Sequence, residues 1–238
     1  MSQPNILVTI AARRGSKGVV GKNIRPLNGK PLMLYSVNQA RQWGKASRIV
    51  VSTDDPLIAQ VAKEAGAEVP FTRPDALSTD DCPKGKVIRH ALIECEKKYQ
   101  EVFDMVVDLD ATAPIRTIQD LDMALEKFEH SDALTLFSVV KAHKNPYFNM
   151  VEDHQGYARI CKSLKGEVYR RQDTPKVMDM NASIYFYRRQ YLLDHETPVP
   201  ITEKSLYHEM DELSAYDIDR EIDFKFLEFL MNEKLIHL

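Results

Sequence analysis

Short apolar runs alternate with amphipathic helical patterns along most of this chain of 238 residues. The apolar runs predict strands at 6–10, 49–53, 67–71, 105–110 and 182–187. The amphipathic segments predict helices at 31–40, 56–65, 84–99, 118–128 and 223–234. Strands separated by helices of this length predict an α/β fold with a parallel or mostly parallel sheet and helices on both faces. Ligands of such sheets bind beyond the carboxyl ends of the strands, so we expect functional residues there.

Two of these helices have recognisable starts. Asp55 is the expected N-cap of the second helix, with Pro56 at the favoured first position. Thr117 and Asp120 resemble a capping box for the helix that ends near Phe128. Both boundaries are therefore predicted from local side-chain chemistry as well as from periodicity.

Residues 138–176 interrupt the alternation. This segment has scattered cations and aromatic residues, few long apolar runs and no clean helical period. We interpret it as an excursion from the main sheet that serves as a lid or as a dimerisation arm. A solvated surface insertion is the alternative interpretation.

The charges of the chain are nearly balanced, and its formal net charge is -3. Non-specific nucleic-acid binding therefore has no bulk electrostatic support. The first residues lack a signal-peptide pattern, and no apolar run approaches the length of a membrane span. Cys82, Cys95 and Cys161 form no metal-ligand spacing and cannot all pair, so we interpret them as reduced thiols. We expect a cytoplasmic protein with neither nucleic acid nor membrane as a partner.

The loop after the first predicted strand carries the strongest functional signal. Four cations, Arg13, Arg14, Lys17 and Lys22, lie among glycines within residues 13–22. Glycine lets backbone N–H groups approach an anion closely, and the cations neutralise its charge. The loop therefore predicts a site for several phosphates, although a solvated basic loop could have the same composition.

Two familiar phosphate fingerprints fail at this loop. A Walker loop needs G-x-x-x-x-G-K-[ST], but Ser16 opens the spacing and Asn23 replaces the hydroxyl that would ligate Mg²⁺. A dinucleotide loop needs G-x-G-x-x-G, and Ser16 again stands in place of the first glycine. The cations also argue against a dinucleotide, because backbone groups and a helix N-terminus usually hold its pyrophosphate.

A second chemical feature is the pair Asp217 and Asp219, separated by one residue. Alternate residues of an extended segment point the same way, so these carboxylates can face one cation. Mg²⁺ is typically held by one or two carboxylates together with phosphate oxygens. Acids before a helix also favour its N-terminal dipole, and this alternative explains Glu221 and Asp223 better than Asp217. Together with the basic loop, the pair predicts a site for phosphates and a metal.

The loop resembles that of the acylneuraminate cytidylyltransferases, the CMP-sialic acid synthetases, whose pattern is roughly A-R-x-x-S-K-G-x-x-x-K-N. Further matches follow in the family's order along most of the chain. They lie at Arg73-Pro74, 109–116, Arg171-Gln172, 181–185 and 217–219. The resemblance implies a single Rossmann-like nucleotidyltransferase domain with a dimerisation arm at about 138–176. It implies a reaction in which the anomeric hydroxyl of a nine-carbon 2-keto sugar acid attacks the α-phosphate of CTP and releases pyrophosphate.

The resemblance also implies roles for individual residues. Those implied to bind the nucleotide are Ala11, Arg13, Lys17, Lys22, Asn23 and Arg73, with Arg73 near the cytosine. Asp217 and Asp219 would bind Mg²⁺, and they complete the implied catalytic set with Arg13 and Lys17. Those implied to contact the sugar are Asp110, Thr112, Arg171, Gln172 and Asn181. The arm residues Arg171 and Gln172 would reach a partner's site across a homodimer.

Several of these residues have alternative roles. Asp110 could accept hydrogen bonds from the sugar, or it could add a third carboxylate to the metal site. Thr112 and Arg116 could serve a purely structural role in the same loop. Asn181 is expected to hydrogen-bond the ligand, but asparagine at the start of a strand often serves a turn.

Departures from the sialic acid pattern bear on the identity of the sugar. Asp110 stands where those enzymes typically have glutamine, while Phe148 and Asp179 stand near positions where a lysine and an arginine are expected. The loss of basic groups indicates a less polar sugar than N-acetylneuraminic acid. The stretches L-D-A-T-A-P, R-Q-D-T-P-K and D-M-N-A-S-I-Y are more similar to the legionaminic acid branch, whose substrate is a 5,7-diacylamino-dideoxy nonulosonate. N-acetylneuraminate and pseudaminate are the alternatives.

Two other classes of protein are compatible with parts of this pattern. A metal-dependent glycosyltransferase could hold a nucleotide-sugar diphosphate with Asp108 and Asp110, or with Asp217 and Asp219. It would not require so basic a loop, and it would release no pyrophosphate. A non-catalytic nucleotide-binding module would use the loop but leave the second acidic pair idle.

Overall fold

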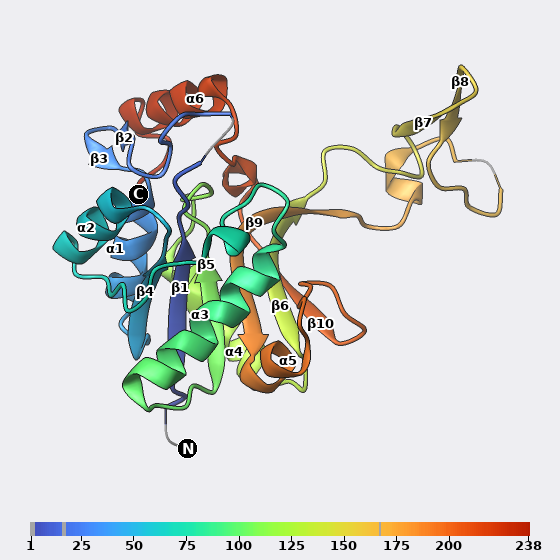
Figure 1. The fold of residues 1–238 in the computed structure, drawn as a ribbon. Helices are drawn as coiled ribbons and strands as arrows, with labels where there is room; N and C mark the ends of the chain where they lie inside the picture. The colour runs from blue at the N-terminus through green and yellow to red at the C-terminus, as the bar shows by residue number, and fades with distance from the viewer. Residues whose placement is uncertain (1–2, 16–17, 167) are drawn as a thin grey trace.

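Six strands form the central sheet of the protein, which a computed structural model describes over residues 3–15, 18–166 and 168–238 (Figure 1). These strands are β1 (Ile6–Ala11), β4 (Arg48–Ser52), β5 (Met105–Leu109), β6 (Thr135–Lys141), β9 (Met178–Arg188) and β10 (Ser205–Glu209). Their order is β10-β6-β9-β5-β1-β4. β9 runs antiparallel to β5 and β6, whereas the other neighbours pair in parallel. The predicted α/β fold with a mostly parallel sheet is confirmed.

Helices cover both faces of this sheet. Those on the faces are α1 (Met33–Trp43), α2 (Pro56–Glu64), α3 (Lys84–Tyr99), α4 (Ile118–Glu129) and α5 (Arg189–Asp194), and the last helix is α6 (Glu221–Asn232). α1 and α4 pack together on one face, and α3 and α5 pack together on the other (Figure 1). Residues of β1 alternate between two cores as a strand requires, since Ile6 and Val8 join the first and Leu7 joins the second.

α6 lies beyond one end of the sheet, at the top of Figure 1, beside the short hairpin of β2 (Pro26–Leu27) and β3 (Lys30–Pro31). Its Phe224 and Leu227 are buried against Val19 and Leu32 in a third apolar cluster. Through Val19, this cluster anchors the loop after β1. The helix predicted from residue 31 begins two residues later at Met33, because Lys30 and Pro31 pair in the hairpin.

Both predicted caps are confirmed. The Asp55 side chain accepts hydrogen bonds from the backbone N–H groups of Leu57 and Ile58, with Pro56 at the first position of α2. At α4, Thr117 and Asp120 form a reciprocal capping box. Each places an acceptor on helix N–H groups that have no partner within the helix.

The strand predicted at 67–71 is wrong. Its only ladder contact among the described residues is an isolated bridge between Glu68 and Val50 of β4. Pro70 follows two residues later and has no backbone N–H to donate, so the pairing cannot continue. The apolar run therefore covers the edge of β4 without extending the sheet.

The excursion begins later than predicted. β6 carries the chain within the sheet to Lys141, so the segment that leaves the sheet, here called the arm, is residues 142–177, with residue 167 outside the described range. The Ala142 N–H donates to the Val177 carbonyl oxygen at 3.2 Å and closes the base of the arm. Ser138, which marked the predicted start, lies buried in β6, where its hydroxyl accepts a hydrogen bond from the Ile184 N–H.

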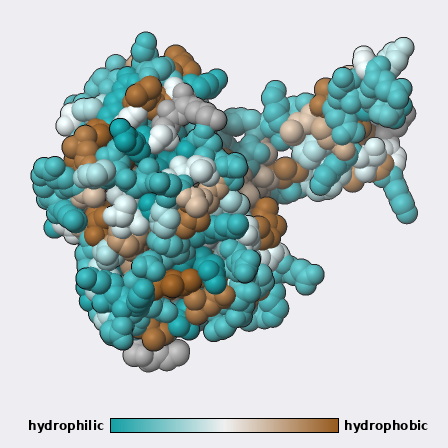
Figure 2. Space-filling model, in the orientation of Figure 1, coloured by the Kyte–Doolittle hydropathy of each residue, from teal (hydrophilic) through white to brown (hydrophobic). Residues whose placement is uncertain are grey.

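The arm projects far from the body of the molecule (Figures 1 and 2). Its tip is a hairpin of β7 (Val151–His154) and β8 (Tyr157–Ile160), in which every residue is exposed. The turn between them uses Gln155 and Gly156, both with positive φ, as a two-residue turn requires. Large apolar side chains remain exposed on the arm at Phe148, Met150, Val151, Tyr157, Ile160 and Tyr169.

Within the described residues, no helix has the length and apolar character needed to cross a membrane. All three cysteines are free thiols, as expected. Burial raises the pKa of the Cys95 thiol to about 12, which makes it unreactive at neutral pH.

Candidate active site

A cavity lies beyond the carboxyl ends of β1 and β5, where an α/β sheet of this type binds ligands. Its volume is about 350 Å³. The predicted site residues that line it are Ala11, Arg13, Lys22, Asn23, Arg73, Asp110, Thr112 and Asp219. Lys17 lies outside the described residues, so its implied role stays a prediction. The fold thus gathers most of the predicted nucleotide set around one cavity.

The loop after β1 packs directly on the segment that carries Asp219. A Cβ added at Gly18 would lie 1.8 Å from the backbone oxygen of Asp219, so only glycine permits this approach. Lys22 Nζ donates to the Ile218 carbonyl oxygen at 2.6 Å and to Asp219 Oδ1 at 3.3 Å. The Ile218 N–H in turn donates to the Thr112 carbonyl oxygen at 3.0 Å. Segments 196 residues apart in the sequence therefore form one continuous wall.

Arg13 and Asn23 shape the loop itself. The buried Asn23 Nδ2 donates to the Arg13 carbonyl oxygen at 2.9 Å, and the Asn23 carbonyl oxygen accepts from the N–H of Met33 in α1. The Arg13 guanidinium forms an ion pair with Asp80, which also lines the cavity. An incoming phosphate would compete with this carboxylate for the guanidinium.

Arg73 forms a buried part of the cavity wall. Its guanidinium donates to the Ser52 hydroxyl at 3.2 Å and to the Ser52 carbonyl oxygen at the end of β4. Burial lowers the pKa of Arg73, and Asp54 and Asp108 partly oppose that effect. The end of β4 thus fixes this cation in the cavity wall.

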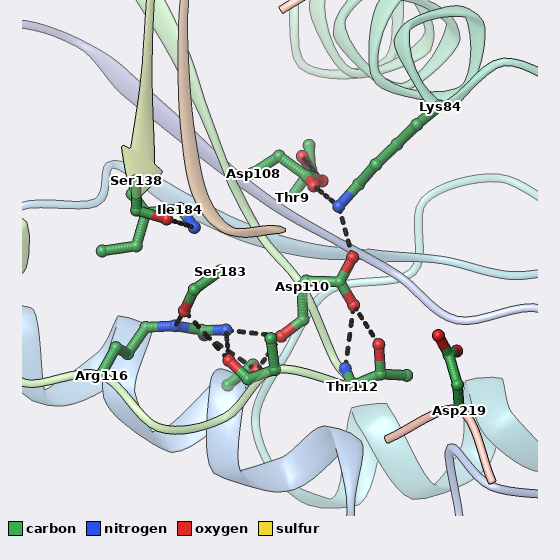
Figure 3. Close-up of polar contacts among 12 residues, drawn as sticks. Thr9, Lys84, Asp108, Asp110, Thr112, Arg116, Ser138, Ser183, Ile184 and Asp219 are labelled. Atoms are coloured by element: carbon green, nitrogen blue, oxygen red, sulfur yellow. Dashed lines mark hydrogen bonds and ion pairs between the residues drawn. The ribbon is translucent and has the colours of Figure 1, made fainter. Parts of the chain in front are cut away.

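Asp110 lies in a cluster of charged and polar groups (Figure 3). Its Oδ2 accepts a hydrogen bond from Lys84 Nζ at 2.6 Å, and the same Nζ lies 2.8 Å from Asp108 Oδ2. Its Oδ1 accepts from the Thr112 N–H and from the Thr112 hydroxyl, each at 2.9 Å. Burial alone would raise the pKa of Asp110, but Lys84 and Thr112 hold it at about 2. Asp110 is therefore ionised at neutral pH, and both its oxygens are engaged.

Arg116 holds the loop after β5 in place (Figure 3). It is buried, and its Nη2 donates to the carbonyl oxygens of Asp110 and Ala113, each at 2.6 Å. Its Nε donates to the Ser183 hydroxyl on β9 at 2.9 Å. Burial lowers the pKa of Arg116 to about 10, which leaves it charged at neutral pH. The structural role considered for Arg116 accounts for these contacts.

Asp217 and Asp219 stand in different surroundings. Asp217 Oδ1 is shielded from solvent and has no hydrogen-bond partner among the described residues. The Asp219 side chain is 74% exposed and borders the cavity. Burial raises the pKa of Asp217, and the carboxylate of Asp110 adds to this effect. A shielded carboxylate oxygen without a partner, next to a second carboxylate, fits the hard oxygen ligands that Mg²⁺ prefers.

The residues that would hold such an ion are therefore Asp217 and Asp219. Both oxygens of Asp110 already have donors. Across the described ranges, no three His, Cys, Asp or Glu side chains are placed to share one ion.

The remaining predicted sugar residues lie away from this cavity. Arg171 and Gln172 lie on the arm and line a separate cavity of about 650 Å³ at its base. Arg171 donates there to the Ala142 carbonyl oxygen. Asn181 is buried, and its amide bonds Ser138 and Ser214 inside the protein. These contacts give Asn181 a structural role, and they leave its expected contact with a ligand without support in this geometry.

Two charged residues of the site were not assigned from the sequence. Lys84 was given no role, and Asp108 was considered only as half of a glycosyltransferase pair. Lys84 lines the cavity, and Asp108 is fully buried beneath it with its Oδ1 accepting from the Thr9 hydroxyl at 2.7 Å. The available signal was the first turn of α3, which contains two lysines and no acid where helices favour acids.

Comparison with known proteins agrees with this geometry. The family model described as Cytidylyltransferase matches residues 7–237. The chain is 43% identical over 229 residues to the CMP-N,N'-diacetyllegionaminic acid synthase of Campylobacter jejuni, with 96% of each chain covered. It is 42% identical over 229 residues to the post-translational flagellin modification protein B of Campylobacter coli, again with 96% of each chain covered. It is 35% identical over 182 residues to the pseudaminic acid cytidylyltransferase of C. jejuni, covering 76% of this chain and 77% of that relative.

A solved structure shares the fold. The CMP:2-keto-3-deoxy-manno-octonic acid synthetase complexed with CTP superposes with a TM-score of 0.69 at 17% identity, covering 97% of this chain and 99% of that one. At that identity the likeness concerns the fold alone. The family match across nearly the whole chain, with relatives above 40% identity at almost full length, shows that this chain is an enzyme of the cytidylyltransferase family.

Proposed function

We propose that this enzyme transfers the CMP group of CTP to a nonulosonic acid, a nine-carbon 2-keto sugar acid, and that the sugar is N,N'-diacetyllegionaminic acid. The observation that carries the proposal is the contact between the basic loop after β1 and the acidic segment around Asp219 at one cavity. The names of the relatives support the sugar class. Identity is higher to the legionaminic synthase of C. jejuni than to its pseudaminic counterpart, 43% against 35%, and extends over more of the chain.

The reaction forms one bond and breaks one. The anomeric hydroxyl oxygen of the sugar attacks the α-phosphorus of CTP, and the bond from that phosphorus to the oxygen bridging the β-phosphate breaks. The hydroxyl proton passes to solvent, and pyrophosphate leaves with the bonding electron pair. Such transfers need little covalent help from the protein, because alignment and charge neutralisation supply most of the catalysis.

The basic loop supplies the positive charge for this step. Lys22 and Arg13 line the cavity and are held by carboxylates that a triphosphate can replace. Asn23 keeps the loop in this shape through its bond to the Arg13 backbone. Arg73 lines the same cavity, and the family resemblance implies that it lies near the cytosine. Mg²⁺ bound by Asp217 and Asp219 would supply charge beside the phosphate oxygens and lower the pKa of the attacking hydroxyl.

The sugar site combines two parts of the molecule. Asp110 and Thr112 line the cavity beside the basic loop in the same chain. Arg171 and Gln172 lie on the arm, outside that cavity, so we assign them to the site of a second copy. Exposed apolar residues of the arm such as Phe148, Met150 and Tyr157 support a homodimer, since uncovered large apolar side chains mark protein contacts.

A pyrophosphate-release assay tests the function. The protein is incubated with CTP, Mg²⁺ and, separately, N,N'-diacetyllegionaminic, pseudaminic and N-acetylneuraminic acids. We expect the highest kcat/KM with the legionaminic sugar, and formation of the CMP-sugar in equal amount to pyrophosphate. Highest activity with another sugar would correct the substrate. No pyrophosphate with any of the three would contradict the transferase proposal and favour a glycosyltransferase or a binding module.

A further inference from the structure

Lys84 is held against the electrostatic preference of its helix. It is the first residue of α3, and Lys86 follows in the same turn with no acid to balance them. The N-terminus of a helix carries partial positive charge, which disfavours an ammonium group there. The position is stabilised instead by Asp108 and Asp110, whose carboxylate oxygens lie 2.8 Å and 2.6 Å from Lys84 Nζ.

These contacts occupy the carboxylates that lie deepest in the site. Asp108 is fully buried, with Lys84 on one oxygen and the Thr9 hydroxyl on the other. Asp110 has Lys84 on one oxygen and Thr112 on the other. The ring of Tyr185 packs 4.7 Å from the ammonium group and adds a favourable contact to a cation. Lys84 therefore stands between two carboxylates in the way that a divalent cation would.

The second acidic pair has a lysine on only one of its carboxylates. Asp217 Oδ1 has no hydrogen-bond partner among the described residues; Asp108 Oδ2 has none either, but it has its ion pair with Lys84. Asp219 is largely exposed, and its contact with Lys22 at 3.3 Å is longer than either contact of Lys84. Lys84 thus contacts both carboxylates of one pair, whereas the lysine at the other pair contacts Asp219 and leaves Asp217 without an ion pair among the described residues.

We propose that Lys84 is a permanent cation of this site, which occupies the place of a second divalent ion between Asp108 and Asp110. The enzyme is thereby limited to one bound divalent ion, at Asp217 and Asp219. Lys84 acts as a positioning residue. It holds the carboxylate of Asp110 in one orientation at the cavity and keeps that carboxylate from binding a metal ion. The inference rests on the proposed function only for the presence of a metal at the second pair.

Counting bound Mn²⁺ tests this inference without the reaction. Mn²⁺ is used in place of Mg²⁺ because free Mn²⁺ gives an electron paramagnetic resonance signal, so the bound amount follows from the free amount. The protein is titrated without CTP or sugar. We expect one bound ion per chain in the wild type and two in Lys84→Met, whose side chain keeps much of the stem but not the charge. Lys86→Met, which removes a charge from the same helical turn, is the matched control and should bind one.

Two further variants keep Lys84 in place, since Lys84→Met leaves the buried Asp108 without a cation. Asp217→Asn should weaken Mn²⁺ binding by about tenfold or more, because a charged ligand is lost. Asp110→Asn should weaken it less than Asp217→Asn does, because the oxygens of Asp110 are already engaged and Asp110 acts on Asp217 only through its charge. Circular dichroism checks that each variant is folded.

Several outcomes would overturn the proposal. These are zero or two ions bound by the wild type, one ion bound by folded Lys84→Met, or loss of Mn²⁺ binding in Asp110→Asn comparable to that in Asp217→Asn. Failure of the pyrophosphate assay with every sugar would instead refute the proposed function and leave the ion count intact. The two proposals can therefore fail separately.

Discussion

Charged side chains around the cavity are paired across long stretches of sequence, whereas the hairpin at the tip of the arm leaves every residue exposed. Lys22 meets Ile218, and Lys84 meets Asp110, in contacts set by the packed body of the fold. None of the hydrophobic clusters formed by the described residues includes a residue of the arm, and the base of the arm is held by polar contacts such as those of Asn145 with Thr174 and Pro175. The cavity is thus organised within one chain, while the arm presents the kind of surface that a second chain would cover.

The largest expected effect is on the cavity side of this comparison. Lys22→Met should lower kcat/KM for pyrophosphate release by about 10²–10³-fold, because a fixed cation beside the phosphates is lost. Its side chain is only 15% exposed and bonds Ile218 and Asp219, so the melting temperature is measured as well, to separate the lost charge from a loosened wall. Arg14→Met is the matched control, since the Arg14 side chain is 80% exposed and lies 3.9 Å from its acidic neighbour Asp55. Equal activity of both variants would remove Lys22 from the catalytic set.

Removing the arm separates the two regions directly. Ala142 and Val177 are joined by a backbone hydrogen bond, so two glycines can connect them in place of residues 143–176. We expect the shortened body to fold with a similar melting temperature, to sediment as a monomer where the full chain is a dimer, and to lose most of its activity. A shortened chain that stays dimeric in sedimentation velocity would show that the contact lies elsewhere.

Asn145→Ala probes the base of the arm more gently. Its Nδ2 donates to the Thr174 hydroxyl at 2.8 Å and to the Pro175 carbonyl oxygen at 3.2 Å. Losing these buried bonds should destabilise the arm locally by about 1–3 kcal/mol. Hydrogen exchange should therefore quicken within residues 142–177 and stay unchanged in β1 and β5. Equal acceleration throughout the body would show that the two regions unfold together.

The smallest expected effect lies in the body, at the α4 capping box. Burial alone would raise the pKa of Asp120, but hydrogen bonds from His208 and Thr117 lower it below its ordinary value. A depressed pKa contributes stability above the unfolded pKa of about 3.9, and this is lost as pH falls through the folded value. Asp120→Asn should lower the free energy of unfolding by about 1 kcal/mol at pH 7, measured with urea.

The pH dependence supplies the control for this variant. The stability difference from the wild type should shrink below about pH 4, where the carboxylate becomes protonated. A difference that stays constant down to pH 3 would assign the effect to packing rather than to charge.

Local chemistry made much of the body predictable. The caps at Asp55 and Thr117 depend on residues two or three positions away, so the sequence displays them directly. The strand proposed at 67–71 failed because the run was judged by its apolar residues alone. Pro70 within it has no backbone N–H, so the pairing with β4 stops there. The start of the arm was misplaced because Ser138 is polar, yet it is buried in β6 where its hydroxyl bonds the next strand.

Much of the site depends on contacts that a sequence does not display. Lys84 contacts Asp108 and Asp110 only once α3 packs against β5, and the sequence around Lys84 does not indicate either partner. Asn181 matches the family pattern, but its amide is directed to Ser138 and Ser214 by the packing of β6 and β9. Motifs predicted many of the residues that line the cavity, but they missed Lys84, and the pairing of the charges required the fold.

The close approach of Gly18 to Asp219 has a consequence for biosynthesis. The basic loop emerges early from the ribosome, but the backbone that completes its wall is made 201 residues later. Until then the cations of the loop have neither Asp219 nor the Ile218 carbonyl to contact. A partly synthesised chain can form β1, β4 and β5 and still lack a finished nucleotide pocket, so competence to handle CTP is gained only near the end of translation.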